Sequence, residues 1–240
     1  MLTKSRLQYL QSLKIKKFRQ RYRQFMLEGE KAVKELIESA YDVEEIFVVG
    51  EFTIHFNGKT TPISTKEMER ISEHKAPPGI VALVNMPAEQ EIAIPTQGKH
   101  LLLDNIQDPG NLGTIIRIAD WYGLDAVYCT ENCVDLYNSK TLNATMGSFC
   151  HLPIYYANIE TLLNNTNIPI LAATLNGSSV YEIEVEANWL LWIGNESNGI
   201  NESLLHLAKT ALKIPEKGKA ESLNAAVACG IIVDNLMKKP

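Results

Sequence analysis

The stretch TALKIPEKGKAESLNAAVACGIIVDNLMK, residues 210–238, combines a short apolar strand, a polar loop and a helix that is apolar nearly all round. Pro215 ends the strand, because proline has no N–H group to donate to a sheet. Ser222 and Asn224 stand at the end of the loop, just before the helix. Loops that follow buried strands are where α/β proteins bind ligands. The stretch therefore predicts a ligand-binding edge, although an ordinary strand–loop–helix has the same pattern.

Length and composition favour an ordinary globular protein. The 240 residues allow one large domain or two small ones, and the hydrophobic content of 45% and charged content of 21% are typical values. No apolar run approaches the roughly 20 residues of a membrane span, and the charged N-terminus does not resemble a secretion signal. The four cysteines lack metal-ligand spacing. We expect a cytoplasmic protein with reduced thiols, no structural metal and no membrane contact.

Charge is unevenly distributed along the chain. Residues 1–34 hold ten basic and two acidic side chains, a net charge of +8. Because the whole chain has a net charge of −5, the other 206 residues have a net charge of −5 − 8 = −13. A basic end on an acidic body suggests a polyanionic partner. Phe18 and Tyr22 alternate with cations, which suits phosphate neutralisation combined with base stacking, although a solvated helix face is an equal alternative. The candidate nucleic-acid contacts are Lys16, Lys17, Arg19, Arg21 and Arg23.

The first 95 residues predict a small α/β domain. Apolar spacing indicates helices over residues 7–15 and 30–39, and apolar runs indicate strands at 45–50 and 79–84. Ser64 or Thr65 followed by Glu67 is a typical capped helix start. Residues 85–100 are rich in Pro, Glu and Gln, as in a linker. We place the domain boundary at residue 95, with domains 1–95 and 96–240.

The second domain alternates strands and helices. Strands are predicted near residues 99–105, 125–130, 168–174, 189–193 and 211–214, and helices near 111–122, 137–147 and after Asn224. Asn111 is the expected cap of the first of these helices. The strands are apolar enough to be buried on both faces. The pattern predicts a mostly parallel sheet with helices on both faces.

Three polar loops follow buried strands of this sheet. The first is followed by Asn111 and Arg117, and the second contains Asn195 and Glu196. The third, residues 215–224, contains Ser222 and Asn224. Gly194 and Gly199 flank the second loop and let its backbone approach a ligand. A dinucleotide enzyme is disfavoured because no G-x-G-x-x-G follows a strand.

The motifs DPGNLGTIIR (108–117), GNESNGI (194–200) and IPEKGKAESLN (214–224) stand in an order that resembles the SpoU/TrmH-type RNA ribose 2′-O-methyltransferases of the SPOUT superfamily. The resemblance covers residues 98–238, and residues before 95 look more loosely like the ribosomal-protein-like substrate-binding domain of many members. It implies S-adenosylmethionine as methyl donor, a homodimer and a C-terminal trefoil knot, which general topology rules would not predict.

The resemblance also implies residue roles. Arg117 is the family's proposed base, but an arginine stays protonated below a pKa of about 12. We therefore expect Arg117 to bind the adjacent phosphate and stabilise the developing alkoxide. The remaining catalytic set is Asn111, Glu196, Ser222 and Asn224, and the cofactor set is Gly194, Ile214, Leu223, Thr174 and Asn195.

Three residues depart from the family pattern: Glu216 stands where relatives commonly have methionine, and Asn143 and Thr145 where many have Arg and Ser. The implied substrate is ribosomal RNA, since a basic arm on an extra domain suits a large folded RNA. Transfer RNA is the second choice, and a catalytically silent RNA-binding relative is the alternative function.

Overall fold

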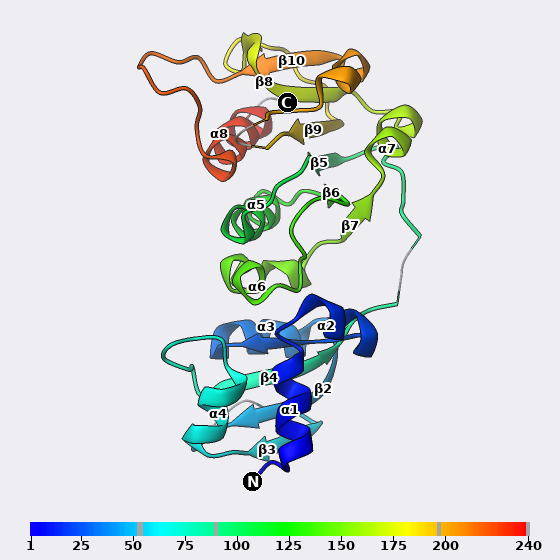
Figure 1. The fold of residues 1–240 in the computed structure, drawn as a ribbon. Helices are drawn as coiled ribbons and strands as arrows, with labels where there is room; N and C mark the ends of the chain where they lie inside the picture. The colour runs from blue at the N-terminus through cyan, green and yellow to red at the C-terminus, as the bar shows by residue number, and fades with distance from the viewer. Residues whose placement is uncertain (52–54, 89–90, 196–197, 239–240) are drawn as a thin grey trace. The chain divides into compact units, whose positions relative to one another are not determined.

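The computed structural model describes residues 1–51, 55–88, 91–195 and 198–238 (Figure 1). The chain forms two compact units, residues 1–90 with 135–151, and residues 91–134 with 152–240. Segment 135–151, which sequence analysis counted in the second domain, therefore packs within the first unit. The boundary at residue 95 stays a prediction. Among the helices described, none is long and apolar enough to cross a membrane.

The first unit contains a four-stranded sheet in the order β1-β4-β2-β3. β4 (Ile80–Asn85) is antiparallel to β1 (Gln24–Glu28) and to β2 (Asp42–Val48), and β3 (Lys59–Pro62) runs parallel to β2. The strands predicted at 45–50 and 79–84 correspond to β2 and β4. The other two were missed because β3 is largely exposed and β1 buries the polar ends Gln24 and Glu28 among apolar residues.

Helices cover both faces of this sheet. α1 (Lys4–Ser12) and α4 (Thr65–Ile71) pack Leu10 and Met68 against Phe47 on one face. α3 (Glu30–Glu38) contacts β1 and β4, and α6 (Ser139–Thr145) also contacts β1. The helix predicted over 7–15 ends at Ser12, and α2 (Lys16–Tyr22) begins after a short break. The predicted cap of α4 is confirmed, because Ser64 and Glu67 form a capping box.

The second unit contains a six-stranded sheet in the order β10-β8-β9-β5-β6-β7, and its strand pairs are parallel. Its strands are β5 (Lys99–Leu103), β6 (Ala126–Thr130), β7 (Ile154–Ala157), β8 (Ile170–Ser179), β9 (Trp189–Ile193) and β10 (Thr210–Lys213). The mostly parallel sheet is therefore confirmed. β7 was missed, because only one of its four residues is fully buried and the apolar run is weak.

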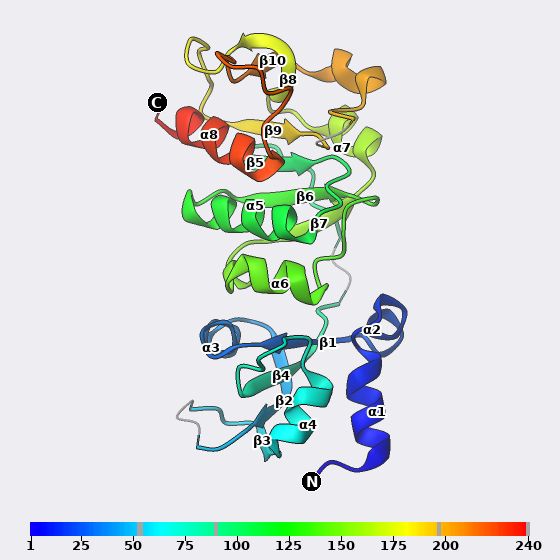
Figure 2. The same cartoon turned by 60° about the vertical axis from the view of Figure 1, so that its left-hand side comes forward.

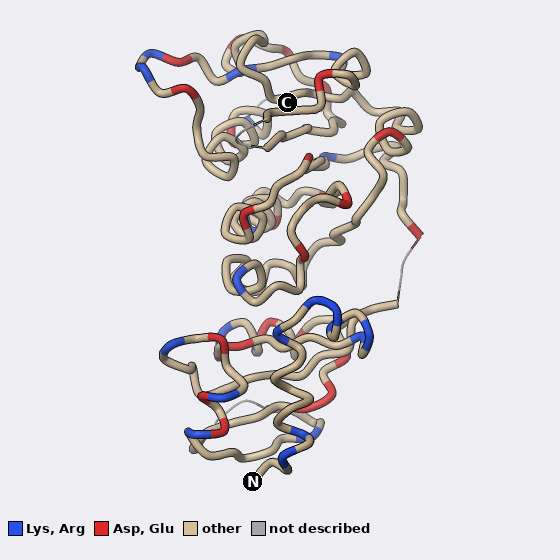
Figure 3. The backbone as a smooth tube through the Cα atoms, viewed as in Figure 1, with Lys and Arg blue, Asp and Glu red and all other residues tan. Residues whose placement is uncertain are grey.

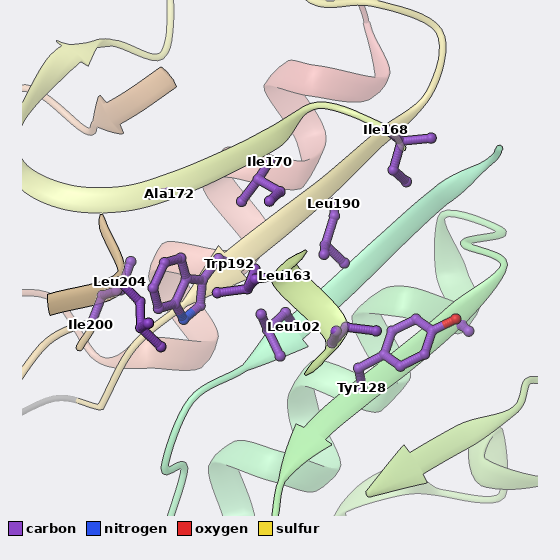
Figure 4. Packing of buried hydrophobic residues seen from close by; sticks show 12 residues of the cluster. Leu102, Tyr128, Leu163, Ile168, Ile170, Ala172, Leu190, Trp192, Ile200 and Leu204 are labelled. Carbon is purple, nitrogen blue, oxygen red and sulfur yellow. The ribbon is translucent and has the colours of Figure 1, made fainter. Parts of the chain in front are cut away.

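Helices lie on both sides of the second sheet (Figure 2). α5 (Pro109–Trp121) and α8 (Ala225–Met237) pack against each other on one side. On the other side, α7 (Ile159–Asn165) and the 3₁₀ segment η2 (Glu202–Leu207) cover a core around Leu102, Leu190 and Trp192 (Figure 4). Because side chains alternate along a strand, this arrangement buries both faces of the central strands.

Candidate active site

Two of the predicted catalytic residues meet between the start of α5, which follows β5, and the start of α8. The side-chain amide of Asn224 donates to Asn111 Oδ1 at 2.8 Å, so the first and third motifs are in direct contact. Asn224 also caps α8, because its Oδ1 accepts from the N–H groups of Ala226 and Val227 at 3.1 and 3.2 Å. The contact joins residues 113 positions apart in the chain.

The cap of α5 differs from the sequence prediction. Asp108, rather than Asn111, is the cap: its Oδ1 accepts from the Asn111 N–H at 2.8 Å, and Pro109 occupies the first helical position. The side chain of Asn111 is thereby directed to Asn224 and is not used for capping. Its predicted role as a helix cap is wrong, and its place in the catalytic set stays a prediction.

Arg117 is exposed on α5, six residues after Asn111. Six residues correspond to about 9 Å along a helix axis. Within the described chain its guanidinium makes no hydrogen bond or ion pair, so it is available to a ligand. The structure does not bring Arg117 into contact with the Asn111–Asn224 pair. Ser222 is exposed in the loop that precedes α8, and Glu196 lies outside the described residues.

The described ends of the second motif lie close together. Asn195 and Gly199 exchange backbone hydrogen bonds of 3.0 and 2.9 Å, and a Cβ at Gly194 would lie 2.3 Å from the Gly199 carbonyl carbon. Only glycine therefore fits at position 194. Asn195 Nδ2 donates to the Asn105 carbonyl at 2.8 Å, which connects this loop to the end of β5. Gly194 is thus required by the close approach of the Gly199 backbone, and Gly199 by its φ of 66°. The predicted approach of this backbone to a ligand stays a prediction.

The residues proposed for the donor include groups suited to S-adenosylmethionine. Thr174 Oγ1 is buried and has no hydrogen-bond partner within the described chain, as expected for a hydroxyl reserved for a ligand. Leu223 is 45% exposed, and Ile214 is half-buried. Such apolar surfaces can cover an adenine ring, and the loop backbone offers N–H and C=O groups to its edge. The donor set therefore fits the cofactor.

Hydrogen bonds that the sequence does not predict hold the turn between β5 and α5. Asn105 has a φ of 58°, unusual for a residue other than glycine, and its N–H donates to Thr130 Oγ1 at 2.9 Å. Cys133 Sγ accepts from the Ile106 N–H at 3.3 Å and donates to the Leu103 carbonyl at 3.2 Å. No local signal in the sequence could have paired residues about 25 positions apart.

The Cys133 thiol has an unusual environment. Its hydrogen bond with the Cys129 thiol lowers the pKa of Cys133 to about 7, and the same contact raises the pKa of the fully buried Cys129. All four cysteines are free thiols, in agreement with the sequence prediction. Groups of three or more metal-binding side chains do not occur in the described part of the chain.

The basic arm lies in the first unit, where Lys and Arg recur along α2 (Figure 3). Lys16, Lys17, Arg21 and Arg23 are exposed. Arg19 differs: it is 5% exposed, donates to the carbonyls of Leu13 and Lys14 at 3.0 Å, and pairs with Asp135 at 2.7 Å.

Arg19 therefore stabilises the unit and is unsuited to the RNA contact proposed from sequence. Phe18 and Tyr22 stack on the same helix with ring centroids 6.3 Å apart, and Arg21 lies over the Tyr22 ring. The remaining four cations and the stacked rings keep the composition of a nucleic-acid surface.

Comparison with known proteins gives two family matches. Residues 98–234 match the model of the SpoU rRNA Methylase family, and residues 4–82 match an MRM3-like substrate binding domain. The chain is 36% identical to the 23S rRNA (guanosine(2553)-2′-O)-methyltransferase RlmP of Bacillus subtilis, over 93% of this chain and 92% of that protein.

Two further relatives were compared. A 23S rRNA (uridine(2479)-2′-O)-methyltransferase of Streptomyces viridochromogenes is 32% identical over 69% of this chain and 62% of that protein. Among solved structures, an AdoMet-bound rRNA methyltransferase from Sinorhizobium meliloti has a TM-score of 0.88 at 28% identity, covering 99% of this chain and 96% of that one.

Proposed function

Because the chain belongs to the SpoU rRNA methylase family, we propose that it transfers a methyl group from S-adenosylmethionine to a ribose 2′-hydroxyl of ribosomal RNA. The observation that carries the proposal is the contact between Asn224 and Asn111, which joins the first and third motifs at the strand ends. The Bacillus and Streptomyces relatives are named 2′-O-methyltransferases, and the Sinorhizobium rRNA methyltransferase was solved with AdoMet.

The cofactor would be held by β8 and by the loops after β9 and β10. Thr174 Oγ1 and the backbone at Gly194, Ile214 and Leu223 supply hydrogen bonds and apolar cover, and Asn195 holds the second loop to β5. When bound, S-adenosylmethionine supplies a methyl group carried by a sulfonium. The chain's own contribution is to hold the hydroxyl in line with that group, since orientation alone can supply much of a rate enhancement.

The ribose hydroxyl is a poor nucleophile at neutral pH and must lose its proton as the new bond forms. Arg117 is exposed, unpaired within the described chain, and permanently charged. We assign it to the phosphate next to the target ribose and to the oxygen on which negative charge develops. Asn111, Asn224 and Ser222 would orient the ribose, and the predicted role of Glu196 stays a prediction.

A homodimer and a trefoil knot belong to the same proposal. Trp121 at the end of α5 is 83% exposed, and Val227 on the adjacent α8 is 52% exposed. Large apolar side chains on two neighbouring helices suit burial against a second copy of the chain. The knot is supported by family membership, and the segment from β10 to α8 is the part of the chain that would be threaded.

The substrate half of the proposal rests on the first unit. The match to a substrate-binding domain covers α1 and α2, and the exposed cations of α2 suit RNA phosphates. Ribosomal RNA is favoured over transfer RNA, because the Bacillus and Streptomyces relatives are named as 23S rRNA methyltransferases. The same proposal places the protein in the cytoplasm.

Ribose-methylation mapping tests the function. Total RNA from cells with and without the gene should differ at a single 2′-O-methyl position in ribosomal RNA. Loss of a transfer RNA methylation instead would revise the substrate, and identical maps would favour the silent RNA-binding alternative. Calorimetry on protein treated with chelator tests the cofactor separately, since absence of binding at millimolar S-adenosylmethionine would contradict the donor assignment.

A further inference from the structure

A small cavity of about 150 Å³ opens beside the proposed site, at the carboxyl ends of β5 and β9. Sites for whole small molecules span roughly 300–1,000 Å³, so this cavity suits a single ring system and not the entire cofactor. Its lining consists of Asp104, Asn105, Asn198, Gly199, Ile200 and Asn201.

The cavity shares a wall with the proposed donor loop. Gly199 lines it and is paired through its backbone with Asn195, and Asn195 Nδ2 is bonded to the carbonyl of Asn105, another lining residue. A nucleotide whose ribose reacts at this edge carries its base one glycosidic bond away. The base must therefore find a place close to the donor loop, and the cavity offers one.

The chemistry of the lining distinguishes between bases. Asp104 Oδ2 accepts from the Asn201 N–H at 3.2 Å, while Oδ1 has no hydrogen-bond partner within the described chain. An ionised carboxylate only accepts hydrogen bonds. Asn105 Oδ1 accepts from Gln107 at 3.2 Å, which leaves its amide N–H groups as donors. The lining thus offers a charged acceptor together with amide donors, and Ile200 adds an apolar wall.

We propose that this cavity binds the base of the target nucleotide and that Asp104 selects guanine. Guanine is the nucleobase whose Watson–Crick edge presents two adjacent donors, N1–H and the N2 amino group, beside one acceptor, O6. The carboxylate matches the donors, and an Asn105 amide matches O6. Enzymes that act on an extruded nucleotide read its base through hydrogen bonds of this kind. The inference rests on the proposed function, and the relatives do not decide the base, because one acts on guanosine and another on uridine.

The first test is the mapped methylation site, which must be a guanosine. A ribosomal 2′-O-methyl group at another nucleotide would overturn the role of the cavity while leaving the proposed function intact. No missing ribose methylation at all would instead contradict the proposed function. The two failures are therefore distinguishable.

The second test uses synthetic RNA fragments that contain the mapped nucleotide as guanosine or as inosine, which lacks the N2 amino group. For the wild-type protein, kcat/KM should fall about 10- to 100-fold on inosine, the range of discrimination for a bidentate base contact. Asp104→Asn keeps an oxygen for the Asn201 N–H but replaces an acceptor by a donor. It should lower kcat/KM on guanosine and bring the guanosine-to-inosine ratio close to one.

Asp125→Asn is the matched control. Asp125 Oδ2 accepts from the Lys99 N–H at 2.7 Å, so it is also a carboxylate bonded to backbone, but at the opposite end of β5. For Asp125→Asn, the ratio of kcat/KM on guanosine RNA to that on inosine RNA should equal the wild-type ratio. If Asp104→Asn reduces kcat/KM equally on both RNAs, Asp104 has only a structural role and the proposal is wrong.

Discussion

Asn224 shows how one side chain can serve two purposes. Its Oδ1 caps α8, while its amide donates to Asn111. An amide can do both because it carries an acceptor and two donors. An aspartate would keep the cap but lose the donor, which explains why an amide suits a residue that joins two motifs.

Arg117→Ala should reduce methyl transfer by about 10²- to 10³-fold, as loss of one group that stabilises developing charge does in other enzymes. The affinity for S-adenosylmethionine should not change, because the proposed cofactor residues do not include Arg117. Single-turnover kinetics and calorimetry measure the two effects. Arg117→Lys is the control, and it should restore activity only partly, since lysine keeps the charge but not the planar fork. Near wild-type rates for Arg117→Ala would contradict the assigned role.

At the scale of elements, the helix cap predicted at the start of α4 is present in the structure. Hydrogen bonds from the Ser64 N–H and hydroxyl, and one from the Leu2 N–H, lower the pKa of Glu67 to about 2. A carboxylate whose pKa is depressed by folding stabilises the protein above its ordinary pKa of about 4.5, and this contribution is lost as the pH falls toward 2.

Glu67→Gln should therefore lower the melting temperature at pH 7, and the difference from wild type should narrow at pH 3. Thermal denaturation followed by circular dichroism measures both values. Glu69→Gln, at an exposed residue of the same helix, is the control and should have little effect at either pH. If Glu67→Gln lowers the melting temperature equally at pH 7 and pH 3, the charge of the Glu67 carboxylate does not contribute to stability.

The basic segment around α2 contains exposed cations and one buried cation, Arg19, and the sequence alone does not distinguish them. Replacing Lys16, Lys17, Arg21 and Arg23 with Gln should weaken RNA binding and reduce the magnitude of its log–log salt slope by about 3 to 4, since each phosphate contact contributes roughly 0.7 to 0.9. Filter binding over a range of salt concentrations measures the slope. An unchanged slope with a lowered melting temperature would favour a structural role for the arm.

Arg19→Gln provides the contrasting variant on the same helix. It leaves Asp135 without its partner, and removal of one member of a buried ion pair costs roughly 3–5 kcal/mol. We expect a lower melting temperature with the salt slope preserved.

At the scale of the whole molecule, we propose that the exposed apolar residues of α5 and α8 form the interface of a homodimer. Trp121→Glu places a charge where we propose that a second copy packs, so it should convert a dimer into a monomer. Light scattering after gel filtration measures the mass. Tyr181→Glu alters another exposed aromatic residue, outside both helices, and should leave the mass unchanged. A Trp121→Glu variant that stays dimeric would exclude this surface as the interface.

The sequence by itself determined the class of the fold and the identity of the motifs. Apolar runs of strand length, such as 99–103 and 189–193, lie between helical segments, and their burial follows directly from hydrophobicity. The capping box at Ser64 was also readable, because a cap depends on residues three positions apart. The three polar loops were found in the same way, by their position after apolar strands.

Only the tertiary structure decided which polar residues have partners. Arg19 and Arg21 are two residues apart on one basic helix, yet Arg19 is buried against Asp135 and Arg21 is exposed. The Asn105 N–H donates to Thr130 Oγ1, and segment 135–151 packs within the first unit although it is flanked by strands of the second. Each of these facts depends on contacts between residues far apart in the chain. Local propensity carries no information about such contacts, since packing and hydrogen-bond satisfaction are settled only when distant segments meet.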